Sequence, residues 1–511
     1  MTGSTGATAR IQAGLEGIPA DIDLVVVGLG VTGAGVALDA AARGLSVLAV
    51  DAHDIAFGTS RWSSKLVHGG LRYLAHGQLG VAYESAVERG ILMEITAPHL
   101  TRPMPMLLPL MSSVSTTQAT LASLGFRAGD ALRFGASTSR QTLPRPRRIS
   151  RNETLRLAPC LRPSGLRGGL LSWDGQLEDD ARFVTCLART AASHGATVRT
   201  RARALSITGR QVTLRDELTD ATYDVRTKGV VNATGVWAGG LVEDVKLRPS
   251  RGTHLVLRGE TLPGLAAALT APVPGTTSRF VFALPQSDGT IYVGLTDEET
   301  DGDIPDVPQP TEGEIGFLLD VISAALDRPL RRSDVVGSYA GLRPLLESGG
   351  STADLSRQHA VITSPTGVVT VVGGKLTTYR KMAEDAVDAT GLSTRPCSTR
   401  RQPLLGAASW DQLGFLEAPE RLIRRFGTEA DLVLSNAQAT GLPDAELLAP
   451  GPRGVTLAEL IFGITHEGAA DIDDLLDRRT RIGLVPSDRA SAVPLAERAF
   501  DLLSSNPSRH Q

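Results

Sequence analysis

The sequence predicts an α/β protein whose parallel sheet is assembled from segments that lie far apart in the chain. Three short valine-rich runs suit buried parallel strands, and each leads into a glycine-containing turn. They lie at 24–27, 229–231 and 368–372. Stretches of alternating apolar and polar residues at 253–257, 280–284 and 290–295 are typical of antiparallel strands. We therefore expect an antiparallel-sheet domain inserted into the α/β domain, followed by a helical C-terminal domain.

The first α/β unit lies within residues 24–51. After the strand comes the turn Gly28-Leu29-Gly30-Val31-Thr32-Gly33, then a helix predicted over 36–43 and a second strand over 46–50. In this strand–turn–helix context the pattern G-x-G-x-x-G is typical of a Rossmann-like dinucleotide site. Gly28 allows the tight turn, Gly30 lets the backbone approach a pyrophosphate, and Gly33 allows the helix to pack closely on the strand. The N–H groups at the start of the helix favour the phosphate charge.

Two further features narrow the choice of dinucleotide. Asp51 ends the second strand, where a carboxylate accepts hydrogen bonds from an adenosine ribose and repels a 2′-phosphate, so NADP is disfavoured. A hydroxyl-rich loop with Thr59, Ser60, Ser63, Ser64 and Lys65 follows, and then His68-Gly69-Gly70. Such a loop suits the pyrophosphate and polyol chain of FAD, and the glycine pair lets backbone lie against a flat ring. An ordinary polar surface loop is the alternative interpretation.

The remaining elements follow the same patterns. Helical periodicity covers 84–97, 181–194 and 378–390, and further strands are expected near 196–200, 203–208 and 211–215. Residues 98–150 contain many Pro and Arg residues and are predicted to be irregular.

These elements set the expected domain boundaries. Residues 1–20 are rich in Gly, Thr and Ala and predict a flexible N-terminal extension. The discontinuous FAD-binding domain is expected over 21–97, 150–250 and 335–392, and the substrate-binding or cap region over 98–149 and 251–334. A linker over 393–406 then leads to the helical domain over 407–511.

Composition excludes several classes of protein. The net charge of -3 does not give the positive field of a typical nucleic-acid-binding domain, so no nucleic acid partner is expected. The three cysteines, Cys160, Cys186 and Cys397, fit neither a disulfide framework nor a zinc cluster, so we expect a cytoplasmic location and no metal. No run approaches the roughly 20 apolar residues of a membrane span, and the first twenty residues lack the apolar core of a secretory signal.

A cluster of basic residues stands out from this near-neutral background. The arginines lie at Arg127, Arg133, Arg140, Arg145, Arg147, Arg148 and Arg151. They are interpreted either as a solvated loop with scattered charges or as a surface that contacts anionic lipid.

Several longer motifs occur in one order along residues 23–390. They are SSKLVHGGLRYL (63–74), EDDARF (178–183), NATG (232–235), RGTHLVL (251–257), GLRPL (341–345) and GGKLTTYRKMAEDA (373–386). Together they closely resemble the FAD-dependent glycerol-3-phosphate dehydrogenases, with the glycerophosphate oxidases as near relatives. HEGAADIDDLLDRRTRIGL (466–484) is similar to the C-terminal helical domain of that family. The resemblance implies a glutathione-reductase-like FAD domain of the D-amino-acid-oxidase type and non-covalent FAD, and it allows a homodimer.

The resemblance also implies an activity. The expected reaction oxidises sn-glycerol 3-phosphate to dihydroxyacetone phosphate by hydride transfer from C2 to flavin N5, and a membrane quinone then receives the electrons. The expected place of such a protein is peripheral on the inner face of the cell membrane. An oxidase that uses O2 and releases H2O2 is the alternative with the same chemistry. An amino-acid or amine oxidase and a non-catalytic FAD-binding regulator are the rivals from other classes.

The candidate site residues follow from the same motifs. His254 matches the active-site histidine of the family and is the predicted base, because a neutral imidazole can take the C2 hydroxyl proton; a structural histidine is the alternative. Arg343 is the second predicted catalytic residue, since a cation stabilises alkoxide character. The substrate phosphate requires several cations and is expected to meet further motif residues. These are Arg72, Tyr73, Lys375 and Arg357, with Lys375 also placed to meet the flavin ring.

A larger set of residues is expected to contact FAD. It comprises Gly28, Gly30, Val31, Thr32, Gly33, Asp51, Thr59, Ser60, Ser63, Ser64, Lys65, Leu66, His68, Gly69, Gly70, Ala233, Thr234, Gly235, Gly374, Leu376 and Thr377.

Overall fold

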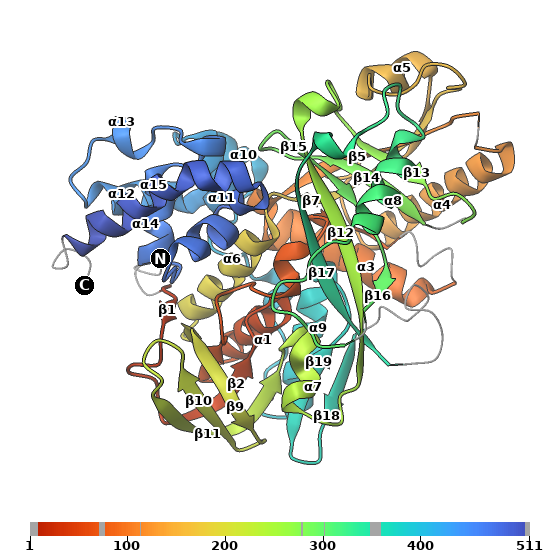
Figure 1. Ribbon diagram of the computed structural model, residues 1–511. Helices are drawn as coiled ribbons and strands as arrows, with labels where there is room; N and C mark the ends of the chain where they lie inside the picture. The colour runs from red at the N-terminus through yellow and green to blue at the C-terminus, as the bar shows by residue number, and fades with distance from the viewer. Residues whose placement is uncertain are drawn as a thin grey trace.

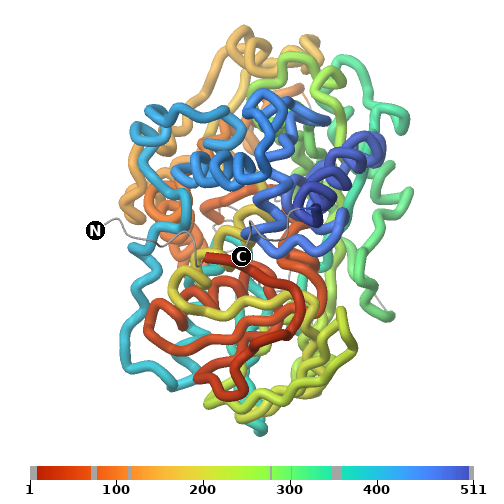
Figure 2. Tube along the Cα trace, turned by 90° about the vertical axis from the view of Figure 1, so that its left-hand side faces the viewer, coloured from red at the N-terminus to blue at the C-terminus, as the bar shows by residue number. Residues whose placement is uncertain are grey.

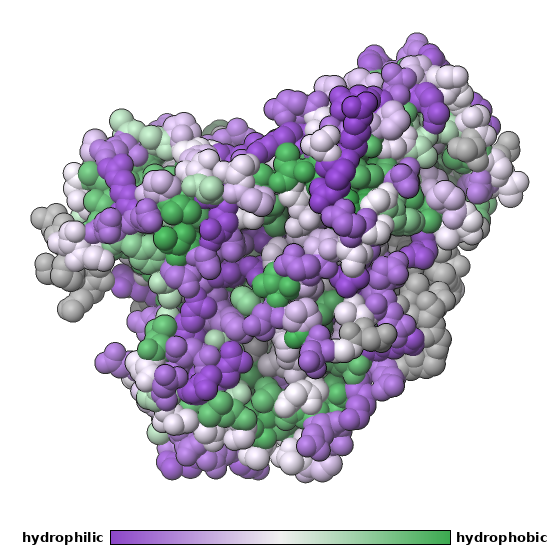
Figure 3. Space-filling model, in the orientation of Figure 1, coloured by the Kyte–Doolittle hydropathy of each residue, from purple (hydrophilic) through white to green (hydrophobic). Residues whose placement is uncertain are grey.

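The computed structural model describes residues 9–70, 77–112, 114–276, 279–300, 302–347 and 359–505. Two large β-sheets with flanking helices form the body of the molecule, and a group of helices from the end of the chain packs against both (Figure 1). Figure 2 shows the first sheet with its helices at the bottom of the view and the C-terminal helices above it. On the face shown in Figure 3, apolar residues appear only in small separate patches.

The first sheet contains the three valine-rich runs that the sequence analysis singles out. Its strands are β1 (Gln12–Ala13), β2 (Asp21–Val27), β3 (Val47–Val50), β8 (Thr197–Thr200), β9 (Ala202–Ile207), β10 (Gln211–Asp216), β11 (Thr222–Asn232), β18 (Ala360–Thr363) and β19 (Val368–Val372). The order is β1-β8-β3-β2-β11-β10-β9, and β19 pairs with β11 and β18. Within the described residues β1, β8, β3, β2, β11 and β19 pair in parallel, which brings their carboxyl ends to one edge.

Three helices cover one face of this sheet. They are α1 (Val31–Ala42), α6 (Asp180–Ser193) and α9 (Tyr379–Thr390), and α1 lies against both of the others. The valines of β2, β11 and β19 are buried on both faces, which explains their continuous apolar character. The first helix begins at Val31, within the glycine motif and five residues earlier than the predicted 36–43, because small residues continue the packing on the strand.

The second sheet is largely antiparallel. Its strands are β4 (Leu66–Val67), β5 (Thr101–Pro109), β6 (Arg147–Ile149), β7 (Gly169–Leu177), β12 (Leu247–Arg258), β13 (Ala268–Pro272), β14 (Phe280–Pro285), β15 (Thr290–Gly294), β16 (Glu298–Glu299) and β17 (Val335–Leu346). The order is β16-β12-β15-β14-β13-β5-β7-β4, with β17 on β12 and β6 on β7. Helix α8 (Glu312–Ser323), which starts at a capping box on Thr311, packs against β12–β15.

Residues 98–150 are more regular than the sequence analysis predicts. They contain β5 and β6 and the helix α4 (Thr116–Gly135), which begins at a capping box formed by Ser115 and Gln118. β5 carries Pro103, Pro105 and Pro109, which are tolerated because β5 pairs with β13 over two residues only in the described part of the sheet. The sequence analysis does not predict α4, because the exposed Leu121, Leu124 and Phe134 interrupt the polar half of the amphipathic pattern.

The C-terminal domain is helical, as predicted. Its helices are α10 (Trp410–Gly414), α11 (Glu420–Phe426), α12 (Ala430–Gln438), α13 (Asp444–Leu447), α14 (Leu457–Thr465) and α15 (Pro486–Ser504). Buried ion pairs join it to the first sheet: Arg182 of α6 pairs with Glu467, and Arg189 pairs with Glu429. Asp54 after β3 receives both Arg478 and Arg479.

The described part of the predicted N-terminal extension is ordered. Residues 12–13 form β1 on the edge of the first sheet, and Ile11 bridges to Glu467 of the C-terminal domain. Ile11 and Leu15 are buried, and this apolar anchoring explains the difference from the predicted flexible segment. The remaining helices are α3 (Leu79–Ile91), α5 (Arg151–Leu157) and α7 (Ala238–Leu241). Across the described ranges, none of the helices has the length and apolar character that a bilayer crossing requires.

Candidate active site

A cavity of about 1180 Å³ lies where the carboxyl edge of the first sheet meets the second sheet. It is larger than the roughly 300–1,000 Å³ of ordinary small-molecule pockets, so it has room for more than one ligand. Residues from the turns after β2, β3, β11 and β19 line one part of it, and residues of β12 and β17 line another.

The glycine turn after β2 is shaped by close approaches of backbone. Gly28 has a φ of +98°, and a Cβ there would lie 2.7 Å from the carbonyl oxygen of Ala233. A Cβ on Gly33 would lie 1.7 Å from the carbonyl oxygen of Gly28, so Gly33 is a packing glycine, as predicted. Ser60 from the hydroxyl-rich loop accepts a hydrogen bond from the Val31 N–H at 2.9 Å and so ties that loop to the start of α1.

Asp51 is held in place at the edge of the cavity. Its carboxylate accepts hydrogen bonds from the N–H groups of Leu29, at 2.7 Å, and His53, at 2.9 Å. Burial raises the pKa of Asp51 to about 6, although the two N–H groups oppose this shift. The carboxylate is therefore held in place at the point where the sequence analysis expects a ribose. Arg203 also lines this end of the cavity and has no motif that predicts it.

The turns after β11 and β19 line the cavity beside the glycine turn. Thr234 is oriented by Asn232, whose side-chain oxygen accepts from the Thr234 N–H and hydroxyl at 3.3 and 2.7 Å. Gly374 has a φ of +69°, and a Cβ there would lie 2.5 Å from the sulfur of Met382. Ala233, Thr234, Gly235, Gly374, Leu376 and Thr377, all predicted to contact FAD, line the cavity.

The loop after β3 divides into two groups of residues. Thr59, Ser60, Ser63, Ser64, Leu66 and His68 line the cavity. Lys65 does not: its ammonium group lies 2.9 Å from Asp180 and donates to the carbonyl oxygens of Arg61 and Ser63. Gly69 and Gly70 are likewise absent from the lining. A Cβ on Gly69 would lie 2.5 Å from Arg89, so this glycine makes room for a side chain.

His254 on β12 projects into the same cavity and is only 2% exposed. Its Nε2 lies 2.8 Å from the Ser64 hydroxyl, and its ring stacks on Tyr339 of β17 with a centroid distance of 4.8 Å. Burial, together with the charges of Lys65 and Arg343, holds the pKa of His254 well below its usual value. The imidazole is therefore neutral at pH 7, and Nδ1 has no hydrogen-bond partner among the described residues.

Two cations that the sequence analysis predicts lie in the same cavity as His254. Arg343 of β17 lies 3.1 Å from Asp297 and donates hydrogen bonds to Ser250 and to the carbonyl oxygen of Thr296. Lys375, after β19, donates to the Ser85 hydroxyl of α3 at 2.7 Å. Sequence reasoning does not identify Asp297 and Ser85 as partners of these cations, because each lies far along the chain from the cation that it contacts. Arg72, Tyr73 and Arg357 lie outside the described residues.

Comparison with known proteins decides the family. The model described as FAD dependent oxidoreductase matches residues 23–380, and the C-terminal domain of alpha-glycerophosphate oxidase matches 397–506. Glycerol-3-phosphate dehydrogenase 1 of Mycobacterium tuberculosis (strain ATCC 25618 / H37Rv) is 52% identical over 491 residues, which cover 93% of this chain and 94% of that protein. The chain belongs to the FAD-dependent glycerol-3-phosphate dehydrogenase family.

Other members of the glycerol-3-phosphate dehydrogenase family agree. The mitochondrial enzyme SDP6 of Arabidopsis thaliana is 34% identical, over 95% of this chain and 82% of that protein. The structure of the glycerol-3-phosphate dehydrogenase from Bacillus halodurans complexed with FAD superposes with a TM-score of 0.69 at 29% identity, over 96% of this chain and 94% of that one. The predicted D-amino-acid-oxidase type of fold and the predicted FAD cofactor are confirmed.

Proposed function

We propose that this dehydrogenase oxidises sn-glycerol 3-phosphate to dihydroxyacetone phosphate. The observation that carries the proposal is that a neutral, buried His254 lines the same cavity as the cations Arg343 and Lys375. The turns after β2, β3, β11 and β19 line another part of this cavity, which we call the dinucleotide cradle. The names of the relatives above point to the same substrate.

The residues of the cradle fit FAD. Gly28 and Gly374 occupy positions that a Cβ would block, and Asp51 presents a carboxylate that two N–H groups hold toward a ribose. The hydroxyls of Thr59 and Ser60 line the path between the two ends of the cradle. When bound, the flavin supplies an acceptor for the hydride from C2 of the substrate.

His254 removes the proton that must leave as the C2 hydroxyl becomes a carbonyl. We assign its Nε2 as the proton acceptor, because this nitrogen lies beside Ser64, which lines the cavity. Once protonated, Nε2–H donates to the Ser64 oxygen 2.8 Å away, and this hydrogen bond stabilises the imidazolium. Tyr339 holds the ring plane by stacking.

Arg343 and Lys375 supply positive charge for a phosphate monoester, which carries close to two negative charges. Asp297, 3.1 Å from Arg343, and Ser85, 2.7 Å from Lys375, fix the two side chains before substrate arrives. A cation near the substrate oxygen also stabilises its alkoxide character, and we assign this role to Arg343. Arg72, Tyr73 and Arg357 remain predicted phosphate ligands.

The expected result of anaerobic mixing is specific bleaching of the flavin. Glycerol 3-phosphate should bleach the oxidised flavin absorbance stoichiometrically, whereas glycerol should not, because it lacks the group that the cations bind. Absorbance is followed after mixing with glycerol 3-phosphate, glycerol or an amino acid. Bleaching by the amino acid alone would indicate an amino-acid oxidase, and no bleaching by any of them would indicate a non-catalytic flavoprotein.

The electron acceptor that we propose is a membrane quinone, and an apolar arm of the cavity supports it. β5 and β13 pair only through Met106 and Leu107 with Ala268 and Leu269 in the described part of the sheet. Residues beyond this pairing on both strands line the arm, together with residues of α4. They include Leu108, Pro109, Met111, Val114, Leu121, Phe126, Thr270, Pro272 and Phe280. An apolar arm that reaches the flavin cavity suits a lipid-soluble acceptor.

The outward face of α4 supports attachment to a membrane. Three large apolar side chains of α4 are exposed: Leu121 at 60%, Leu124 at 57% and Phe134 at 75%. Figure 1 shows α4 at the edge of the molecule opposite the C-terminal helices. Among the arginines of 127–151, Arg133 is buried against Asp130, but the others are exposed. Apolar side chains flanked by cations are typical of a surface that lies on anionic lipid. We propose that the dehydrogenase docks through α4 on the inner face of the cell membrane.

Replacing Leu121 with aspartate is expected to slow the transfer of electrons to quinone without slowing the reduction of the flavin by substrate. Turnover with quinone embedded in anionic vesicles should fall about tenfold, because a carboxylate at the mouth of an apolar arm opposes both lipid contact and quinone entry. Anaerobic bleaching by glycerol 3-phosphate should not change. Leu205→Asp, at an exposed leucine on β9, is the matched control and should leave both rates unchanged. Stoichiometric peroxide from the unmodified protein without quinone would instead support the O2-dependent oxidase.

A further inference from the structure

The loop segment that carries Ser64 is held from behind by Asp180, the first residue of α6. One oxygen of the Asp180 carboxylate accepts the Ser63 N–H at 3.0 Å and the Ser63 hydroxyl at 2.8 Å. The same oxygen lies 2.9 Å from the Lys65 ammonium. Ser64 is therefore fixed on both sides by one buried carboxylate, and its own hydroxyl is left to meet His254.

Lys65 closes this arrangement from the other side. Its ammonium group donates to the carbonyl oxygens of Arg61, at 3.1 Å, and Ser63, at 3.0 Å. It also lies 4.7 Å from the ring centre of Tyr339, which donates its hydroxyl to the Ser63 carbonyl and stacks on His254. Lys65, a predicted FAD contact, thus acts behind the cavity wall rather than in it.

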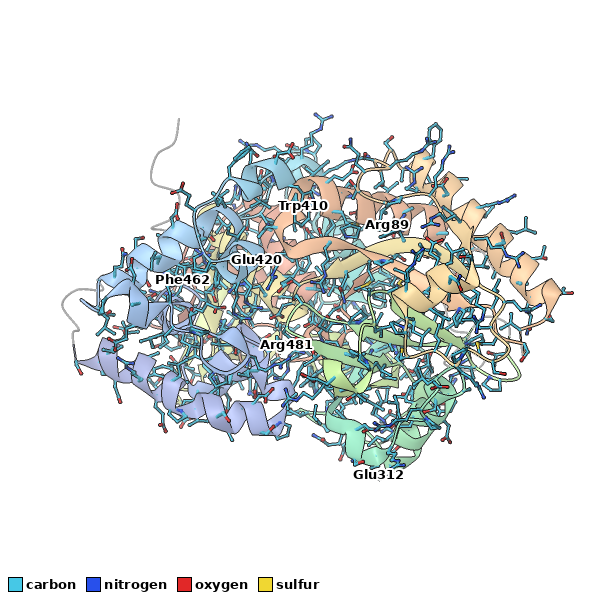
Figure 4. The ribbon with its side chains drawn as sticks, turned by 90° about the horizontal axis from the view of Figure 1, so that it is seen from above. Arg89, Glu312, Trp410, Glu420, Phe462 and Arg481 are labelled. Atoms are coloured by element: carbon cyan, nitrogen blue, oxygen red, sulfur yellow. The ribbon has the colours of Figure 1, made fainter. Side chains whose placement is uncertain are left out.

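Arg481 reaches the same cluster from the C-terminal domain. Its Nε lies 3.5 Å from the other oxygen of Asp180, which also accepts the Ala181 N–H, and 3.8 Å from Asp179, and its Nη2 donates to the Arg61 carbonyl. Its guanidinium lies over the ring of Trp62 at 5.4 Å. Figure 4 shows Arg481 between the C-terminal helices and the strands of the second sheet.

Each charged side chain in this layer lies beside a partner of opposite charge. Asp180 and Asp179 face Lys65 and Arg481, Asp179 also receives Arg425, and all five side chains are buried. Removing one member of such a group leaves an uncompensated buried charge, and the remaining groups must shift to accommodate it. The group nearest to the cavity that would shift is the Ser63–Lys65 backbone, since it bonds directly to both Asp180 and Lys65.

We propose that Arg481 and Lys65 are positioning residues for His254: through Asp180 they fix the Ser64 hydroxyl that orients the imidazole, so the C-terminal domain completes the catalytic centre. The inference rests on the proposed function in that reduction of the flavin by glycerol 3-phosphate is its kinetic readout. It gives the C-terminal domain a role beyond packing.

The test is a double-mutant cycle on the full-length holoenzyme. Arg481→Met should slow flavin reduction about 10- to 100-fold with less than about a twofold change in substrate Kd, because small misplacements of a catalytic group are costly. Ser64→Ala should slow flavin reduction by a similar factor. The variant that carries both substitutions should be no slower than the slower single variant, because both act on the same hydrogen bond to His254. Arg481→Lys should restore part of the rate. Arg189→Met, which breaks a buried pair with Glu429 away from this cluster, should lower the melting temperature without changing the rate.

A second readout follows the histidine itself. In ¹⁵N-histidine NMR spectra, one tautomer of His254 is expected in the unmodified protein and in Arg189→Met, and a mixture in Arg481→Met. Multiplicative rate losses in the double variant, or an unchanged rate and tautomer in Arg481→Met, would overturn the inference. If Arg481→Met does not retain FAD, Arg481→Lys takes its place in the cycle. Failure of the unmodified protein to be bleached would count against the proposed substrate, and the NMR comparison would still decide the positioning role.

Discussion

Replacing His254 with alanine is expected to slow reduction of the flavin by glycerol 3-phosphate about 10²- to 10⁴-fold, the range contributed by a positioned general base. The loss should appear in the rate constant of reduction, while the substrate Kd changes little, because we propose that the phosphate binds to Arg343 and Lys375 and not to His254. Anaerobic stopped-flow absorbance gives both quantities. His194→Ala, at the C-terminal end of α6 and away from the cavity, is the control. An equal rate in the two variants would remove His254 from the mechanism.

The same histidine predicts an unusual pH profile. A base must be neutral to act, and the pKa of His254 lies well below its usual value of 6.5 because the ring is buried beside cations. The rate of flavin reduction should therefore stay nearly constant between about pH 6 and 8, where an ordinary histidine base would lose activity on acidification. The profile is measured by stopped-flow mixing across this range. A decline centred near pH 6.5 would show that the imidazole titrates normally.

Replacing Asp54 with asparagine is expected to lower the free energy of unfolding by about 3–5 kcal/mol, the usual cost of removing one partner of a buried ion pair. Asp54 is fully buried and receives Arg478 at 2.6 Å and Arg479 at 2.8 Å, so the variant removes a carboxylate charge that two buried cations share. Denaturant unfolding measures the change. Asp21→Asn, which breaks an exposed pair with Arg226, should have no resolvable effect.

The pH dependence of stability provides an independent check on Asp54. The arginines lower its pKa to about 2 against burial, which acts in the opposite direction. A carboxyl with a lowered pKa stabilises the fold fully above its unfolded value near 3.8, and this contribution is lost as the pH falls through about 2. The acid-induced loss between these values should be smaller in Asp54→Asn than in the unmodified protein. Parallel acid-unfolding curves for the two proteins would contradict this assignment.

The parts of the fold that sequence reasoning predicts are those whose composition reflects local surroundings. The strands β2, β11 and β19 are buried on both faces, and their sequences are therefore rich in consecutive valines. Gly28 and Gly33 of the glycine turn lie at the positions where the backbone packs too closely for a Cβ. α4 is not predicted, because the exposed Leu121, Leu124 and Phe134 obscure the contrast between its buried and exposed faces.

The rest of the site depends on contacts between distant segments. Ser85 and Lys375 are 290 residues apart in the chain, and Arg481 and Arg61 are 420 residues apart. No local sequence pattern can therefore predict either hydrogen bond. Lys65 lies in a motif whose neighbouring residues line the cavity, but its ammonium group points away from the cavity and pairs with Asp180. A motif thus predicts the neighbourhood of a side chain more reliably than the direction in which it points.

The neighbouring positions of β2, β11 and β19 have a consequence for synthesis. The cradle needs Gly28 and Gly374 together, and 346 residues separate them in the chain. At roughly 5–20 residues per second, the ribosome takes about 17 to 70 s to make that interval. During this time β2 first lacks its partner β11, and β11 then lacks its partner β19. The two glycine turns therefore come together only late in synthesis, and a ribosome that stops before residue 374 releases a product that lacks one of them.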